Sequence, residues 1–314
     1  MTDFVTLGET LALLANPTAG PLRHAPELRL GVAGAESNVA VGVRRLGHTA
    51  SWLGRVGDDE MGRLVLARIR GEDIEVRAQL DPDAPTGLML KEHRFAGLSR
   101  VVYYRAGSAG SRFSPADLDE QVIAGARVLH LTGITPALSA TAREAVWAAI
   151  DIARKADATI CLDYNYRSAL WDPAAAGREL RDLTKVADVV FAGEDEGQLV
   201  TGECSADAVA RSLAALGPAE VIIKQGADGA LAWVDDTLID VSAVPVQAVD
   251  PVGAGDAFVA GYLSARLDGA DTRTRLREAT LAGAFAVTVH GDWEGLPERR
   301  EMALLEQTGG TVLR

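Results

Sequence analysis

The chain has 314 residues, 48% of them hydrophobic, and 31 basic against 44 acidic side chains give it a formal net charge of −13. Because no basic cluster interrupts this acidic balance, we expect no nucleic-acid or anionic-membrane partner. Cys161 and Cys204 lack metal-ligand spacing, the first residues lack a basic and apolar leader, and no run approaches a membrane span. We therefore expect a reduced, cytoplasmic protein.

Short β-branched runs alternate with longer helical patterns over most of the chain, which is typical of βαβ units and a parallel sheet. We expect strands at residues 4–7, 51–56, 128–131, 159–163, 186–191, 221–224 and 230–234. We expect helices at residues 37–46, 61–70, 141–155, 174–183, 206–216, 255–267 and 273–289. This length fits one α/β domain over residues 1–314.

Two segments interrupt the alternation, residues 11–34 and 85–105. The second contains two strand-like runs around a polar turn. Strands inserted among βα units are expected to form a small antiparallel flap over one end of the parallel sheet. The flap is expected to act as a lid that keeps water away from a reaction, and the alternative is an edge hairpin with no closing motion.

The sequence VDPVGAGD at residues 249–256 runs directly into an apolar helical pattern. A helix start leaves backbone N–H groups unpaired and carries partial positive charge, so this turn can bind an anion, and Gly253 and Gly255 allow close approach. A carboxylate at Asp256 would repel a bound phosphate, unless it removes a proton from a hydroxyl that attacks that phosphate. The alternative is that Asp256 only caps the helix.

Polar residues also occur at the start of the helix expected at residues 37–46 and directly after the strand expected at residues 159–163. Gly34 allows close approach of a polyol and the amide of Asn38 can bind two hydroxyls, although a simple helix cap is the alternative. Arg167 follows a strand at the sheet edge where ligands bind in open α/β folds. It is a candidate partner for a carboxylate or phosphate, with a surface salt bridge as the alternative.

A third group follows the expected strand at residues 221–224. Lys224, Gly226 and Gly229 form a K-x-G-x-x-G sequence, which fits a turn along a nucleotide or a plain β-turn. The chain has no G-x-x-x-x-G-K-[ST] sequence, so a P-loop is excluded. No G-x-G-x-x-G opens the first βα unit, so nothing supports a dinucleotide fold.

Together these segments resemble the ribokinase-like carbohydrate kinases of the PfkB family, and among them the 2-keto-3-deoxygluconate kinases. The resemblance runs from Gly8 to Gly295. It is carried by GAESNVAV at 34–41, GRVGDD at 54–59, YYRAGSA at 103–109, DYNYR at 163–167 and DPVGAGD at 250–256. It implies a three-layer α/β/α fold with a mostly parallel central sheet and a small antiparallel β-lid.

The resemblance also implies an activity and a site. The activity is ATP-dependent phosphorylation of the terminal primary hydroxyl of 2-keto-3-deoxygluconate, with Mg²⁺ and with K⁺ as a further candidate. Asp256 is implied as the base beside an anion hole of Gly253, Ala254 and Gly255. Implied sugar-acid contacts are Gly34, Asn38, Tyr104, Arg105, Arg167 and Asp250. Implied nucleotide contacts are Asn165, Lys224, Gln225, Gly226, Gly229 and Gly255, with Glu196 indirectly linked to the metal.

Two positions depart from the family pattern. Gly193 stands where many relatives have Asn, which affects the phosphate-side magnesium network, and Met89 stands where close relatives often have an aromatic hydroxyl. The preferred sugar acid can therefore differ, and its gluconate or galactonate stereochemistry stays open. The alternatives are a kinase for a neutral ketose or a nucleoside and, more remotely, a non-catalytic sugar-acid binding protein. We also expect a homo-oligomer, because an apolar flap often pairs with a copy of itself.

Overall fold

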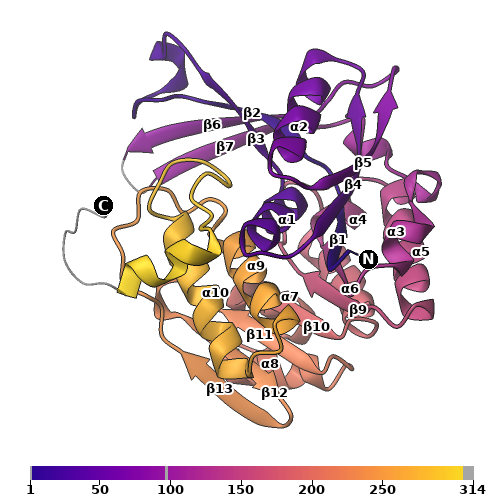
Figure 1. Cartoon of the computed structure of the whole chain (residues 1–314), viewed down its shortest axis with the longest axis vertical. Coiled ribbons are helices and arrows are strands. Elements are labelled where there is room, and N and C mark those ends of the chain that lie inside the picture. The colour runs from indigo at the N-terminus through magenta and orange to yellow at the C-terminus, as the bar shows by residue number, and fades with distance from the viewer. Residues whose placement is uncertain (1, 96–97, 307–314) are drawn as a thin grey trace.

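The computed structural model describes residues 2–95 and 98–306. Within them a nine-stranded sheet forms the centre. Its strands are β1 (Phe4–Leu7), β4 (Ala50–Gly57), β5 (Glu75–Asp81), β8 (Val128–Thr132), β9 (Thr159–Asp163), β10 (Val189–Gly193), β11 (Glu220–Lys224), β12 (Ala230–Val234) and β13 (Thr237–Val241). They lie in the order β13-β12-β11-β10-β9-β8-β1-β4-β5 (Figure 1). Neighbouring strands are parallel except β11–β12 and β12–β13, which make an antiparallel edge.

Helices cover both faces of this sheet. They are α1 (Ala35–Arg45), α2 (Glu60–Gly71), α3 (Glu120–Ala124), α4 (Ile134–Leu138), α5 (Ala140–Lys155), α6 (Pro173–Thr184), α7 (Glu194–Thr201), α8 (Ala206–Ala214), α9 (Ala254–Leu267) and α10 (Thr272–Ala286). Among the described residues, every helix is too short or too polar to traverse a lipid bilayer.

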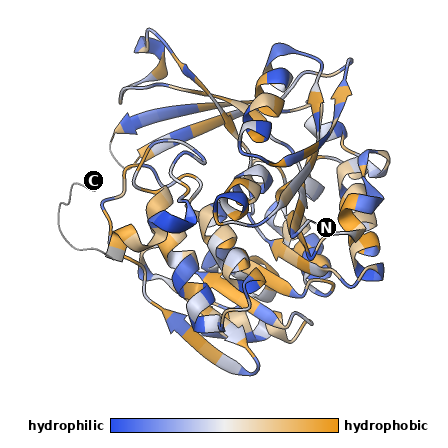
Figure 2. Cartoon of the chain, in the orientation of Figure 1, coloured by the Kyte–Doolittle hydropathy of each residue, from blue (hydrophilic) through white to orange (hydrophobic). Residues whose placement is uncertain are grey.

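Alternate strand residues bury into two apolar cores, one on each face. One core joins the sheet to α1, α2, α9 and α10 through residues such as Val39, Tyr262 and Leu276. The other joins it to α3, α5, α6 and α8 through residues such as Val146 and Leu180. Figure 2 shows the apolar residues along the strands and on the sheet-facing sides of helices. The predicted three-layer α/β/α arrangement is confirmed.

Side-chain caps set where most of the longer helices begin. The Oδ1 atom of Asp59 accepts a 2.7 Å hydrogen bond from the backbone N–H of Gly62 at the start of α2, and Ser139 caps α5 in the same way. Helix α9 starts differently, because its N-cap residue is Gly253 and no side chain caps it. The first N–H groups of α9 therefore remain oriented toward the space in front of the helix.

The flap predicted from residues 11–34 and 85–105 forms a separate four-stranded sheet. Its strands are β2 (Leu11–Ala15), β3 (Arg29–Ala33), β6 (Leu88–Phe95) and β7 (Leu98–Tyr104), in the order β3-β2-β6-β7. The β2–β3 and β6–β7 pairs are antiparallel as predicted, and a parallel β2–β6 pair joins them. In Figure 1 this small sheet spans one side of the molecule, beyond α1 and α9.

The predicted strands and helices are present, with differences at particular places. The strand expected at residues 186–191 forms as β10, Val189–Gly193, since Thr184 and Lys185 still belong to the end of α6. Helix α10 ends at Ala286, and the carbonyl of Val287 instead accepts the N–H of Val249, 2.7 Å away. This bond ties the end of α10 to the segment that leads into α9. Strands β5 and β13 and helices α3, α4 and α7 were not predicted.

Candidate active site

Two cavities meet at the carboxyl edge of the central sheet. The first, of about 530 Å³, lies between the inner face of the lid and the residues that follow β1, β8, β9, β10 and β11. The second, of about 630 Å³, is mostly apolar and includes Val244, Val246, Phe258 and Val287. They share Lys224, Pro251 and Gly255, so the turn before α9 forms the wall where they join.

That turn requires glycine at position 253. Gly253 has φ 82°, and a Cβ there would lie 2.1 Å from the carbonyl oxygen of Asp292. A Cβ at Gly255 would meet only the ammonium nitrogen of Lys224, at 3.7 Å. The positive end of α9 and the Lys224 ammonium therefore face the same space, which gives a place suited to a phosphate group.

Lys224 is held in place by a carboxylate from the neighbouring part of the sheet. Its Nζ lies 2.6 Å from Oδ1 of Asp163, the last residue of β9, and Asp163 is buried. Burial alone would lower the pKa of Lys224, but the charges of Asp163 and Glu196 and the hydrogen bond to Asp163 raise it above its usual value. The side chain is thus a fixed cation between the two cavities.

Asp256 lies in the first turn of α9, inside the polar cavity. Its carboxylate accepts hydrogen bonds from the side-chain amides of Asn38, 2.8 Å from Oδ2, and Asn165, 3.3 Å from Oδ1. Asn165 reaches it from a left-handed backbone position, φ 41°, which Asn tolerates better than most residues. Since the N-cap is Gly253 and these partners belong to other segments, Asp256 is not a helix cap.

The surroundings of Asp256 raise the pKa of its carboxyl group toward neutral pH. Burial raises its pKa to about 7, the charges of Asp163 and Asp292 act in the same direction, and the Asn38 hydrogen bond opposes them. Asp292 is also buried and its pKa is raised to about 6, first by burial and then by nearby carboxylates, while Lys91 and Asn38 lower it. A carboxylate with such a pKa can accept a proton and release it again.

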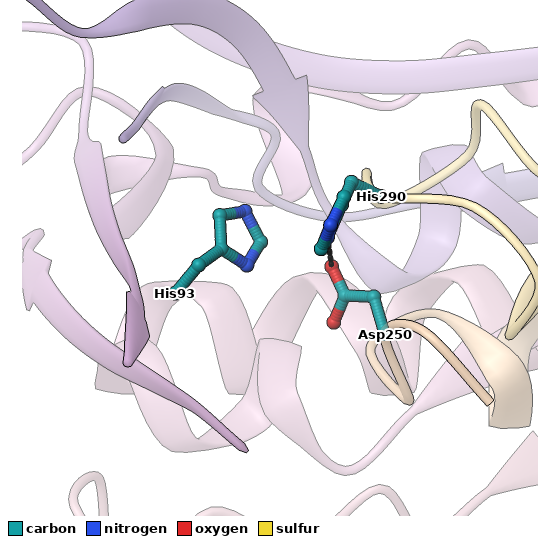
Figure 3. Close-up of side chains that lie close together, drawn as sticks. All are labelled: His93, Asp250 and His290. Atoms are coloured by element: carbon teal, nitrogen blue, oxygen red, sulfur yellow. Dashed lines mark ion pairs between the residues drawn. The ribbon is translucent and has the colours of Figure 1, made fainter. Parts of the chain in front are cut away.

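Asp250 was predicted to contact substrate, but it does not line the polar cavity. Its carboxylate is fully buried, with Oδ2 2.6 Å from the ammonium nitrogen of Lys91 on lid strand β6. His93 and His290 lie beside it, with the Nδ1 atom of His290 3.9 Å from the same oxygen (Figure 3). A contact between Asp250 and substrate therefore stays a prediction, and in this structure the carboxylate is paired with Lys91.

Two arginines predicted to bind the sugar acid line the polar cavity in different states. Arg105 is already paired with Glu9, whose Oε2 lies 2.7 Å from its Nε and 2.6 Å from its Nη2. Arg167 donates to the neutral carbonyl of Tyr166 at 3.2 Å and makes no ion pair within the described part of the chain. The guanidinium of Arg167 is therefore better placed to bind a ligand carboxylate.

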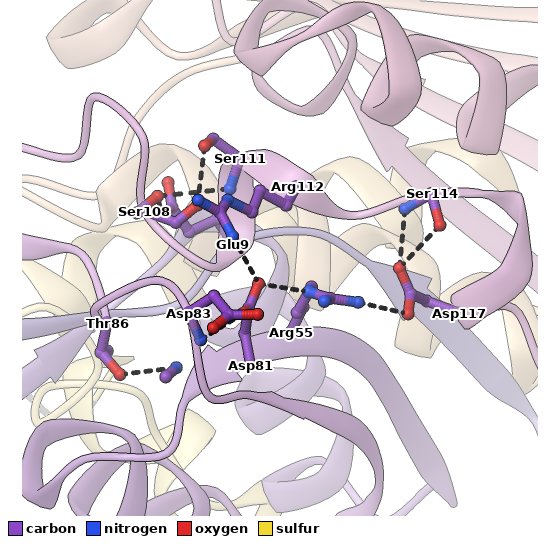
Figure 4. A network of polar contacts seen from close by, with 11 residues as sticks. Glu9, Arg55, Asp81, Asp83, Thr86, Ser108, Ser111, Arg112, Ser114 and Asp117 are labelled. Carbon is purple, nitrogen blue, oxygen red and sulfur yellow. Dashed lines mark hydrogen bonds and ion pairs between the residues drawn. The ribbon is translucent and has the colours of Figure 1, made fainter.

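A polar network holds the segment that carries Arg105. Ser108 donates a hydrogen bond to Glu9. Asp117, further along the same segment, pairs with Arg55 on β4 at 3.0 Å, and Arg55 also lies 3.0 Å from Asp81 (Figure 4). Asp81 is the last residue of β5, and Asp117 lies in the segment that leads from the lid back to the central sheet. These ion pairs therefore hold that segment against the edge of the central sheet.

Other predicted residues are divided between the cavities and their surroundings. Gly34 and Asn38 line the polar cavity, whereas Ala254, Gly226 and Gly229 line the apolar one. Tyr104 is 60% exposed and lies outside the polar cavity, whereas Tyr103 lines it, since neighbouring strand residues face opposite sides.

Gln225 and Glu196 are each engaged with neighbouring protein groups. Gln225 donates to Glu194 at 2.8 Å and lines neither cavity. Glu196 lines the polar cavity, and its two oxygens accept the backbone N–H groups of Tyr166 at 2.8 Å and Gly193 at 2.6 Å. Glu196 therefore fixes the loop that bears Arg167.

Sequence reasoning assigned no role to several charged residues of the site, namely Glu9, Glu36, Lys91, Asp163 and Asp292. Glu36 is buried on the cavity wall, where Thr132 and Thr135 donate to it at 2.6 and 2.8 Å; burial raises its pKa. The signal was available in part, because Glu36 and Asp163 lie within motifs already singled out. Lys91 and His93 share the period-two face of a strand with apolar Met89.

Known proteins resemble this chain in sequence and in fold. A 2-dehydro-3-deoxygluconokinase from Thermoproteus tenax is 39% identical over 306 residues, 96% of this chain and 93% of that protein. A 2-dehydro-3-deoxygluconokinase from Bacillus subtilis (strain 168) is 36% identical over 320 residues, 99% and 97% of the two chains. Among solved structures, a protein provisionally named ribokinase II from E. coli, in complex with ATP and Mg²⁺, has a TM-score of 0.91 at 25% identity and covers 98% of this chain and 100% of its own.

The family profile "pfkB family carbohydrate kinase" matches residues 1–299, nearly the whole chain. This match and the two relatives confirm the resemblance that the sequence motifs indicated. The chain belongs to the pfkB family of carbohydrate kinases.

Proposed function

We propose that this kinase transfers the γ-phosphoryl group of ATP to the terminal primary hydroxyl of 2-keto-3-deoxygluconate. One observation carries the proposal: a polar cavity and an apolar cavity meet at Lys224 and Gly255, and Asp256 stands beside that junction on the polar side. A sugar acid in the first cavity and a nucleoside in the second would bring hydroxyl and phosphate together there. The names of the two relatives support this substrate.

The apolar cavity fits a nucleotide base. Its wall combines aliphatic side chains and Phe258 with Gly226 and Gly229, which let a ribose approach the backbone. The phosphates would extend toward Lys224 and the first turn of α9. Magnesium, when bound, neutralises charge on the phosphates and prefers oxygen ligands, which the Glu196 and Asp163 carboxylates next to this place can offer directly or through water.

The chain's own residues then perform two tasks. Asp256 accepts the proton of the sugar hydroxyl as the hydroxyl oxygen forms a bond to the γ-phosphorus. The bond from that phosphorus to the bridging oxygen breaks at the same stage, and ADP leaves with that oxygen. Backbone N–H groups of residues 253–255 and the Lys224 ammonium stabilise the negative charge on the group in transfer.

Arg167 supports an acidic rather than a neutral sugar. Its guanidinium faces the polar cavity without a carboxylate partner among the described residues, and a neutral ketose or nucleoside would leave it unmatched. Gly34 and Asn38 line the same cavity and are proposed to contact the sugar, while Arg105 shapes its wall together with Glu9. Met89 is also on this wall and is proposed to affect the preferred stereochemistry.

A screen for ADP release tests the proposal. It would compare 2-keto-3-deoxygluconate, 2-keto-3-deoxygalactonate, fructose and adenosine at equal concentrations, with kcat/KM as the readout. We expect the gluconate-derived acid to react fastest. A preference for fructose or adenosine would support a neutral-sugar or nucleoside kinase, and no ADP release with any acceptor would favour a sugar-acid binding protein.

We propose one domain over residues 1–314 whose inserted segments close as a lid, and a cytoplasmic location where ATP is available. A homo-oligomer would cover an apolar row across the outer lid face, formed by the paired residues Leu30, Leu14, Leu90 and Val102. Light scattering of the purified protein measures the oligomeric state.

A further inference from the structure

Lys91 is a buried cation on the inner face of the lid. Its side chain is 0% exposed, as is that of Asp250, and its Nζ lies 2.6 Å from Oδ2 of Asp250. The same nitrogen donates to the carbonyl oxygen of Gly291 at 3.1 Å and lies 3.7 Å from Oδ1 of Asp292. One ammonium from β6 thus faces oxygen atoms of two separate C-terminal segments, a costly arrangement unless each charge is matched.

Both of those segments contact the turn at residues 253–255, the catalytic turn. The Oδ1 atom of Asp250 accepts the N–H of Val252 at 3.3 Å, directly before Gly253. The carbonyl of Asp292 packs against Gly253 so closely that a Cβ there would lie 2.1 Å from it. The carboxylate of Asp292 accepts a hydrogen bond from the side-chain amide of Asn38, which also donates to Asp256. Lys91 is therefore connected through short contacts to the anion hole and to the base.

The neighbouring histidines make a metal ion a competing explanation for this cluster. Ligand atoms of His93, Asp250 and His290 lie within 4.8 Å of one another (Figure 3). However, the ammonium of Lys91 already lies against the carboxylate oxygen that such an ion would use, and it would repel a second cation. The geometry favours the lysine as the positive charge of the cluster.

We propose that Lys91 is a positioning residue. Its ammonium group, on the lid, supplies the positive charge that holds the segments around the catalytic turn. Phosphoryl transfer therefore needs no added monovalent cation. The inference rests on the proposed kinase function. Without the ammonium, the carboxylates of Asp250 and Asp292 would face each other and Asp256 with no positive charge between them. The turn before α9 would then move to separate them.

Chemical rescue of Lys91→Ala tests the role of the charge. The variant removes most of the side chain, and we expect kcat to fall about 100-fold while the KM values for ATP and the sugar acid change far less. Propylammonium should restore at least about 10-fold of the lost kcat, whereas propanol of equal size should not. Wild-type kcat should stay the same when tetramethylammonium replaces K⁺. Equal rescue by propanol, a wild-type kcat in Lys91→Ala, or a K⁺ requirement in the wild type would overturn the proposal.

A second readout separates this inference from the kinase proposal. Propylammonium, and not propanol, should raise the melting temperature of Lys91→Ala even if no acceptor is ever phosphorylated. If Lys91→Ala does not fold, the double variant Lys91→Met/Asp250→Asn removes both charges and should fold with reduced kcat that propylammonium does not restore; full kcat in this variant would contradict the proposal. Lys185→Ala is the matched control, since Lys185 is an exposed lysine paired with Asp182, and it should match the wild type.

Discussion

The Nδ2 atom of Asn38 lies 2.8 Å from Oδ2 of Asp256, and the same amide reaches Oδ2 of Asp292 at 3.3 Å. One neutral side chain from α1 thus donates to two buried carboxylates that repel each other. Both carboxyl pKa values lie above their usual range because of burial, and the Asn38 amide lowers each of them. Asn38 therefore lowers the pH at which the proposed base becomes ionised, in addition to its proposed contact with the sugar.

The pH dependence of catalysis should report this arrangement. Since Asp256 must be ionised to accept a proton, kcat should rise with pH through an apparent pKa of about 7. Asn38→Ala should move this acidic limb to higher pH, because the hydrogen bond that favours the ionised form is lost. Activity at pH 6 should then fall more than activity at pH 8, and an unmoved limb would remove Asn38 from this role.

The free energy of unfolding should also depend on pH, because the pKa of Asp256 is raised in the folded state. A carboxyl group whose pKa is raised from 3.8 to about 7 on folding stabilises the folded state below about pH 4 and loses that contribution as pH rises to about 7. In Asp256→Asn the side chain cannot ionise. The free energy of unfolding of this variant, relative to that of the wild type, should therefore increase by about 1.4 kcal/mol for each pH unit between about pH 4 and about pH 7. Urea unfolding at pH 5, 6, 7 and 8 measures the difference. A constant difference would show that Asp256 titrates normally.

Turnover by Asp256→Asn tests the same residue in its chemical role. The amide oxygen can keep one of the two hydrogen bonds that the carboxylate accepts from Asn38 and Asn165, but the amide cannot accept the proton. The kcat should therefore fall by about 10³-fold or more, with KM values within a few fold of the wild type. Steady-state ADP release measures both constants. Near-normal kcat in a folded variant would mean that another group is the base.

The turn before α9 offers a matched pair of glycine substitutions. Gly253→Ala should cost about 2 kcal/mol or more of stability and most of the activity, because φ is 82° and the new Cβ would clash with the Asp292 carbonyl. Gly269 has a similar φ of 78°, but no atom lies within 4 Å of a Cβ there. Gly269→Ala should therefore cost only about 1 kcal/mol and leave kcat intact. Thermal unfolding with assays of both variants tests this, and equal losses would contradict it.

Arg167 should decide between acidic and neutral sugars. Arg167→Ala should raise KM for a 2-keto-3-deoxy sugar acid by about 10- to 100-fold, as expected for loss of a charged hydrogen-bonded contact, and change KM for fructose little. Arg63→Ala, at an exposed arginine on α2, is the control and should change neither constant. A similar change in KM for both sugars would favour the neutral-sugar alternative.

Local patterns in the sequence were sufficient for the central strands and for the catalytic turn. The strands β9, β10 and β11 are short β-branched runs buried on both faces, and the glycines before α9 identify an anion site within a few residues. Strand β5 was missed because its sequence EVRAQLD is mostly polar, as suits a sheet edge.

Side-chain pairings across the fold could not be predicted in the same way. The resemblance implied Tyr104 as a sugar contact, whereas Tyr103 lines the polar cavity. A shift of one residue along a strand reverses its two faces, and the sequence does not determine which face of the lid is the inner one. The contact between Asn38 and Asp292 joins residues 254 positions apart, and the pairing of Lys91 with Asp250 depends on how the lid docks. Such contacts arise from the assembled fold rather than from any local pattern.

The most direct test is a crystal structure of the Asp256→Asn variant with ATP, Mg²⁺ and 2-keto-3-deoxygluconate. We predict the γ-phosphorus in front of the backbone N–H groups of Gly253 to Gly255, near Lys224, with the terminal sugar hydroxyl between it and residue 256. A γ-phosphorus outside this turn, or a sugar hydroxyl directed to a different side chain, would contradict the proposed function.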